Sequence, residues 1–137
     1  PLLDAIDIVE VLKQYEMGRN TNVHHSLLDS SVGKSTNLLF SFCNYGRKDG
    51  MDKVHENCEL GCALSLVPGE KLEEVMREIE GIVGSAIDKN NWMKSQRPDL
   101  KWISGVSSAE TDQTSQIYQI TYKVISKYGT TPKITFA

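Results

Sequence analysis

The chain has 137 residues, which is enough for one domain with one hydrophobic core. Its apolar fraction of 39% and charged fraction of 24% are those of an ordinary soluble protein. The net charge of −3 provides no basic excess that would favour nucleic acid or an anionic membrane. The sequence has no apolar run of the roughly 18 residues that cross a membrane, and it has no signal-peptide pattern after Pro1. We therefore expect neither a nucleic-acid partner nor a membrane partner.

The three cysteines are an odd number, and two of them fall on one predicted strand. At a rise of roughly 3.3 Å per residue, Cys58 and Cys62 would lie about 13 Å apart, which is too far for a disulfide. We interpret the cysteines as small buried hydrophobic side chains and expect a cytoplasmic location.

The N-terminal third predicts a helix, a long loop and a strand. Residues 2–17 carry apolar side chains at helical spacing, and residues 18–36 are polar and rich in turn-forming residues. Residues 37–45 alternate as a strand does, with one side formed by Leu38, Phe40 and Phe42 and the other by Leu39, Ser41 and Cys43. We expect this strand to pair antiparallel with the next one.

The clearest pattern in the chain covers residues 58–87. Alternation predicts a strand over 58–66, which Pro68 and Gly69 end, and apolar residues from Leu72 to Ile87 then recur at helical spacing. Three carboxylates stand at the expected start of this helix, where the macrodipole favours negative charge: Glu70, Glu73 and Glu74.

The C-terminal part predicts a polar connection over 88–98, a short strand over 100–103, and a loop through Asp112. A helix should follow from an N-cap at Ser115 to Tyr128, with Gly129 as its stop. Residues 133–137 have the composition of a further strand.

This order predicts an α+β fold, a ferredoxin-like two-layer sandwich with an antiparallel sheet and two helices on one face. The sandwich would comprise residues 1–112, and residues 113–137 would be a helix and strand leading away from it. The first strand of the sandwich is missing. It would lie between 58–66 and 100–103, so we expect 58–66 to have an open edge. Residues 133–137 of the same chain or of a neighbouring one could fill the gap.

Three groups of residues could suggest chemistry, and each has a simpler interpretation. Residues 33–36 spell the end of a phosphate-binding loop, but Leu28 stands where that motif needs glycine, and a strand follows instead of a helix. His55, Cys58 and Cys62 would be too far apart on a strand to share one metal ion. His24 and His25 have only Asp29 near them in sequence, so a solvated loop pair is the simpler interpretation. We therefore predict no catalytic residues and no metal ligands in this chain.

Several stretches, taken in order, resemble the lid or dimerisation domain of the M20 family of zinc amidohydrolases. Residues 4–6 resemble the family's G-x-N-A-I helix start, and residues 54–60 its V-P-x-x-C-E-L strand start. Residues 67–75 (VPGEKLEEV) are similar to L-P-G-E-x-x-E-E-V. Residues 88–102 resemble the D-x-W-L…P-P…W segment of acetylornithine deacetylase-like members, and residues 129–132 resemble G-x-x-P.

The resemblance implies a parent enzyme that hydrolyses amide bonds of N-acyl amino acids or small peptides. Its two zinc ions and its general base would belong to a catalytic domain outside these residues, and this segment would cover the site and form a homodimer. Two positions depart from the family's substrate-binding pattern. Ser65 stands where an arginine often holds a substrate carboxylate, and Asp52 stands where asparagine is common.

Two alternatives remain open from the sequence. The chain could be a free-standing ferredoxin-like binding or assembly module, or part of a non-catalytic M20 homologue. The departures at Ser65 and Asp52 strengthen the second of these alternatives, while the lid of an active enzyme remains the leading interpretation.

Overall fold

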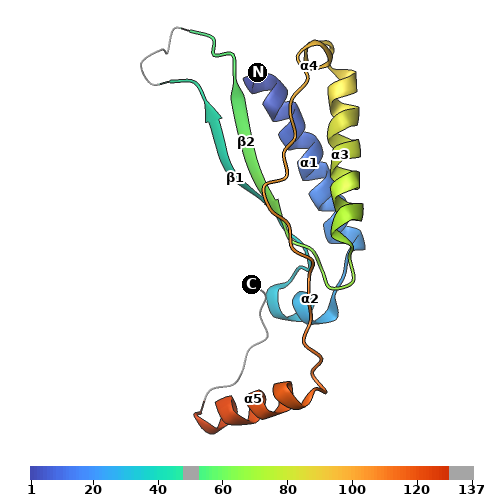
Figure 1. The fold of residues 1–137 in the computed structure, drawn as a ribbon, viewed down its shortest axis with the longest axis vertical. Helices are drawn as coiled ribbons and strands as arrows, with labels where there is room; N and C mark the ends of the chain where they lie inside the picture. The colour runs from blue at the N-terminus through green and yellow to red at the C-terminus, as the bar shows by residue number, and fades with distance from the viewer. Residues whose placement is uncertain (48–52, 130–137) are drawn as a thin grey trace.

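The structure, a computed structural model, describes residues 1–47 and 53–129. The elements in chain order are α1 (Leu2–Asn22), α2 (Ser26–Val32), β1 (Leu38–Tyr45), β2 (Cys58–Leu64), α3 (Leu72–Lys89), α4 (Asn91–Ser95) and α5 (Gln116–Lys127). Figure 1 shows the β1–β2 hairpin beside α1 and α3, while α5 stands apart at the end of a long connecting segment. The described chain is therefore an α+β fold.

β1 and β2 pair antiparallel, as the sequence predicts, and within the described residues their sheet has only these two strands. Its register contains a bulge, because Phe40 faces Cys62 whereas Phe42 already faces Gly61, so Ser41 is an extra residue in β1. The bulge reverses the alternation beyond it. Cys43 thus shares a face with Leu38 and Phe40, and the prediction that Phe42 would lie on that face is wrong.

The core lies mainly between α1 and α3. α3 is strongly amphipathic, as predicted, and buries Val75, Ile79, Val83 and Ile87 along one stripe. The full set of buried core residues is Leu12, Leu38, Val75, Ile79, Val83, Ile87 and Met93. α1 contacts both strands and α3, and α3 packs on α1 and α4. The second long helix therefore extends the helical layer past the edge of β2.

The segment predicted as one long loop over 18–36 is largely helical. α1 continues to Asn22, and α2 occupies residues 26–32 before Gly33 ends it with a φ of 84°. Serine and asparagine made this stretch look like a loop because they favour turns in isolation. Here Thr21 and Asn22 hydrogen-bond to carbonyl groups four residues earlier and remain within α1.

The predicted strand over 100–103 is wrong, since residues 96–112 form neither helix nor strand. The preceding polar connection contains the short helix α4, which begins after Asn90. The Asn90 side chain accepts hydrogen bonds from Trp92 N and Met93 N, and it caps the helix in this way.

The predicted helix after Ser115 is confirmed as α5. Ser115 Oγ accepts a hydrogen bond from Tyr118 N at 3.4 Å, and Gly129 follows the helix with a φ of 74°. α5 buries no residue against the rest of the protein. The predictions for residues 133–137 and for Asp52 fall outside the described residues. None of the described helices is both long and apolar enough to cross a membrane.

A candidate binding groove beside strand β2

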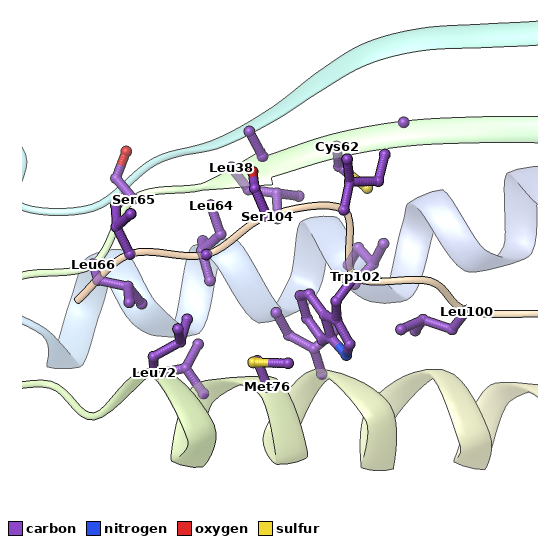
Figure 2. A pocket seen from close by; sticks show the side chains of 18 of the residues that line it. Leu38, Cys62, Leu64, Ser65, Leu66, Leu72, Met76, Leu100, Trp102 and Ser104 are labelled. Atoms are coloured by element: carbon purple, nitrogen blue, oxygen red, sulfur yellow. The ribbon is translucent and has the colours of Figure 1, made fainter. Parts of the chain in front are cut away.

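A groove of about 1900 Å³ runs along β2 and continues towards α5. Its walls are β2 and the following residues to Leu66, the adjoining faces of α1 and α3, and the extended segment of residues 97–110. Figure 2 shows this segment passing between β2 and α3, with Trp102 and Met76 inside the space they enclose. We call this feature the β2 groove.

The edge of β2 that faces the groove lacks a strand partner within residues 1–47 and 53–129, because β2 pairs only with β1 there. A strand edge of this kind carries unused backbone donors and acceptors, which readily pair with another extended chain. The predicted open edge on this strand is thus present, and residues 100–103 do not close it by pairing directly with β2.

The segment that forms the outer wall is attached at separate points. Trp102 Nε1 donates a hydrogen bond to Glu80 Oε1 at 2.8 Å, and Ser108 Oγ donates one to the Val67 carbonyl. Between these points the segment comes so close to α3 that a Cβ on Gly105 would lie 3.0 Å from Leu72. A larger residue at this position would require the Leu72 side chain to shift.

The floor of the groove is apolar and partly open to solvent. Leu64 and Leu66 from the end of β2, and Leu72 and Met76 from α3, are half-buried. Trp102 keeps 41% of its surface exposed, although it lies over this floor. Such a surface could accept the apolar side of an extended peptide, while the edge of β2 supplies hydrogen bonds to its backbone.

One end of the groove is fixed by a buried ion pair. Arg19 is 5% exposed and lies 2.7 Å from Glu70 Oε2, which also accepts a hydrogen bond from Val67 N. Burial, the largest single influence, would lower the pKa of Arg19, but the hydrogen bond that Arg19 donates to Glu70, the charge of Glu70 and the contact with Tyr15 together raise it. Glu70 therefore ties the Pro68–Gly69 turn to α1, just before α3 begins.

Ser65 lies beside the groove but is held by its backbone. Ser65 N donates to the Asn37 carbonyl, and its own carbonyl accepts from Thr36 Oγ1 at 2.8 Å. Its hydroxyl points away from α3, as Figure 2 shows. Ser65 therefore brings no charged group to the groove. The other predicted substrate-binding residue, Asp52, is outside the described residues.

A serine, an aspartate and a histidine come together next to α2, although not in an order suited to nucleophilic catalysis. Asp29 accepts a hydrogen bond from Ser35 Oγ at 2.6 Å and lies 3.0 Å from His24 Nδ1. The carboxylate thus stands between serine and histidine, whereas nucleophilic activation needs the histidine beside the serine. These contacts hold α2 to the chain that follows it.

The second histidine of this region is not the solvated residue that the sequence suggests. His25 Nε2 lies 3.1 Å from Glu110 Oε2, which connects α2 to the outer wall of the groove. Its Nδ1 is buried without a hydrogen-bond partner. Nothing in the spacing of residues 25 and 110 could have indicated this contact, because 85 positions separate the two partners.

The phosphate-loop fragment does not form a phosphate site. Ser35 and Thr36 are buried, with Ser35 bonded to Asp29 and Thr36 bonded to the Ser65 carbonyl, and the strand β1 follows them. Over the described ranges, no three His, Cys, Asp or Glu side chains are arranged to hold a metal ion.

The cysteines differ from the prediction. Cys43 and Cys62 are exposed and Cys58 is half-buried, so none is a core side chain. Cys43 Sγ lies 3.9 Å from Cys58 Sγ across the hairpin. From the sequence, only Cys58 and Cys62, which lie on one strand, were compared, and the pair Cys43–Cys58 was therefore missed. The signal for it was the hairpin itself, which brings residues before and after its loop together.

Comparisons of the chain with protein-family models, with curated protein sequences and with solved structures find no match.

Proposed function

We propose that this chain is the lid and dimerisation part of a metal-dependent hydrolase of the M20 type. The parent enzyme would act on amide bonds of N-acyl amino acids or small peptides in the cytoplasm. The proposal rests on the ordered set of motifs that resemble those of the family. One structural observation supports it: a helix–hairpin–helix unit whose second strand has an open edge, as expected for a lid sandwich that lacks one strand.

The turn between β2 and α3 adds a physical reason for one of these motifs. In Val67-Pro68-Gly69-Glu70, Gly69 has a φ of 94°, which disfavours other residues, and Glu70 is bound to Arg19 and to Val67 N. The motif therefore serves to lock a turn, and this role does not require the substrate. Ser65, three residues before Pro68, offers no cation to a substrate carboxylate, so in this proposal the substrate is recognised by other residues.

The zinc ions that the family implies do not fit the described residues, because these residues bring no set of ligands together. In this proposal another part of the full-length protein holds the metal, and we assign no catalytic step to residues of this chain. The contribution of the chain is to cover the active site and to pair with a second subunit.

A second candidate is a free-standing ferredoxin-like binding module, and the β2 groove favours it. An open strand edge above an apolar floor is how several peptide-binding domains hold an extended partner. A non-catalytic M20 homologue would share the fold of the first candidate without its activity.

One experiment separates these candidates. An antibody raised against this chain is used to isolate the protein from its source cells, and its mass is compared with the 15.3 kDa of the chain. We expect a larger protein that hydrolyses N-acetyl- or N-succinyl-amino acids, loses activity with a chelator and regains it with zinc. A protein of 15.3 kDa would support the free-standing module, and a larger protein without activity would support the non-catalytic homologue.

The isolated chain provides the matching control. Because its described residues form no metal site, we expect no tight zinc binding in a titration and no hydrolysis of the same substrates. Stoichiometric zinc binding with turnover by the chain alone would contradict the division of labour proposed here.

A further inference from the structure

The two sulfur atoms that meet across the hairpin suggest a site of oxidation. Cys43 Sγ and Cys58 Sγ are 3.9 Å apart, and both residues lie on the same face because the bulge at Ser41 shifts the alternation of β1. In a regular strand Cys43 would point to the opposite face. We propose that Cys43 and Cys58 form an oxidant-sensitive dithiol, which peroxide converts to a cross-strand disulfide. This inference does not depend on the proposed function.

The two thiols differ in exposure, so they take different steps in the oxidation. Cys43 is exposed, so it meets hydrogen peroxide first, and its sulfur takes one peroxide oxygen to become a sulfenic acid while water leaves. The half-buried Cys58 then attacks this sulfur, the S–S bond forms and a second water leaves. Two thiols and one peroxide thus give one disulfide and two waters. Burial, and then the contact with Cys43, raise the pKa of Cys58, in keeping with its acting second.

The register shows what must move. Cys43 faces Leu60 and Cys58 faces Tyr45, so the two cysteines are diagonal neighbours. Diagonal Cα atoms are about 7–8 Å apart in general, slightly beyond the usual range for a disulfide, so the strands must approach each other by about 1–2 Å. The pair stands near the loop end of the hairpin, since β1 ends at Tyr45 and β2 begins at Cys58. We expect a bond formed under this constraint to be reversed readily by glutathione.

The third cysteine provides a matched control. Cys62 lies on the same strand as Cys58 and is exposed, as Cys43 is, and partial burial of its thiol raises its pKa. Cys62 faces Phe40 and is the other diagonal neighbour of Cys43 in the register, but the sulfur that Cys43 contacts is that of Cys58. The purified chain is reduced, treated with hydrogen peroxide, alkylated and weighed, and the same is done with Cys62→Ser, Cys43→Ser and Cys58→Ser.

We expect the wild-type chain to lose about 2 Da, the mass of two hydrogens, before alkylation. One of its three thiols should then remain available for alkylation. Cys62→Ser should lose the same mass, and Cys43→Ser and Cys58→Ser should form no internal bond. Trypsin cuts after Arg47 and Lys53, so it separates Cys43 from Cys58 but leaves Cys58 and Cys62 in one peptide. The linked peptides of Cys62→Ser therefore identify the bond as Cys43–Cys58.

Three results would overturn the proposal. These are a bond that includes Cys62, bonds only between separate chains, and accumulation of sulfinic acid without any internal bond. Circular dichroism of each serine variant before oxidation checks that it is folded. A Cys43→Ser or Cys58→Ser chain that is folded and still loses two hydrogens would contradict the assignment in the same way.

Discussion

Arg19 and Glu70 show how much one buried pair can hold in place. Arg19 also donates to Thr36 Oγ1 at 3.3 Å, so its guanidinium connects α1 both to the start of β1 and to the turn before α3. Three elements therefore depend on a single cation, and removal of its carboxylate partner should be costly.

We predict that Glu70→Gln lowers the free energy of unfolding by about 2 kcal/mol, because it leaves a buried guanidinium without its counter-charge. Denaturant titration measures this change. Glu74→Gln is the matched control, since Glu74 pairs with Lys71 on the exposed face of α3. Equal effects of the two substitutions would show that the buried pair has no special role.

A second prediction at this scale concerns Glu16, which is buried and accepts hydrogen bonds from Lys13 and from Leu38 N. Burial alone would raise its pKa, but these bonds outweigh it and hold the pKa below the ordinary value of 4.5. Its contribution is thus complete above pH 4.5 and is lost as pH falls through the lower pKa of the folded state. Glu16→Gln should unfold more easily at pH 7, by about 1–3 kcal/mol, and show a shallower loss of stability in acid.

Urea titrations at a series of pH values between neutral and strongly acidic measure both effects. Glu10→Gln, on the exposed part of the same helix, is the matched control. Parallel acid profiles for wild type and Glu16→Gln would show that the buried carboxylate contributes nothing to the pH dependence.

At the scale of elements, the helices and strands with strong periodicity could be predicted. Which of their side chains face the core could be predicted only in part. α3 matches its prediction because its apolar spacing is sustained over five turns and its polar face is charged. The bulge at Ser41 could not be predicted. The apolar residues of 37–45 alternate regularly in the sequence, and this pattern gives no sign of an extra residue in the strand. The predicted strand over 100–103 does not form. Leu100 and Trp102 instead line the groove, on an extended segment that is not part of a sheet.

The boundary predicted at residue 112 can be tested by truncation. α5 buries no residue, so removal of residues 113–137 should leave the remaining fold intact. We predict a thermal midpoint within about 3 °C of the full chain and a helical signal reduced by the 12 residues of α5. Circular dichroism during heating measures both. A midpoint lower by more than about 8 °C, or loss of a cooperative transition, would place α5 within the same folding unit.

At the scale of the molecule, local patterns located the secondary structure but not the long-range polar contacts. Arg19 pairs with Glu70 and His25 with Glu110, and neither pair has a spacing that a sequence pattern detects. The open edge of β2 was foreseen from topology alone, since a helix–strand–strand–helix order leaves one place in a ferredoxin-like sheet empty. The site followed from the fold and not from any motif of reactive residues.

The molecule also exposes large apolar side chains on both α1 and β1. On α1, Leu3 and Ile6 keep 76% and 44% of their surface exposed, and on β1 Leu39 and Phe42 keep 57% and 45%. In the part of the chain that the structure describes, β1 has β2 as its only strand partner, so a helix face and a strand edge are both free to pair. This arrangement favours self-association through α1 and β1.

We therefore predict a homodimer, with a light-scattering mass that rises towards twice 15.3 kDa as the concentration increases. The double variant Leu3→Gln and Ile6→Gln should shift this rise to higher concentration, because it removes apolar contact area while leaving the buried Leu12 in place. Ile103→Gln is the matched control, since Ile103 is 91% exposed but lies on the wall of the groove and not on α1. A chain that stays monomeric at high micromolar concentration would refute the dimer. An equal effect of Ile103→Gln would move the contact from α1 to the groove.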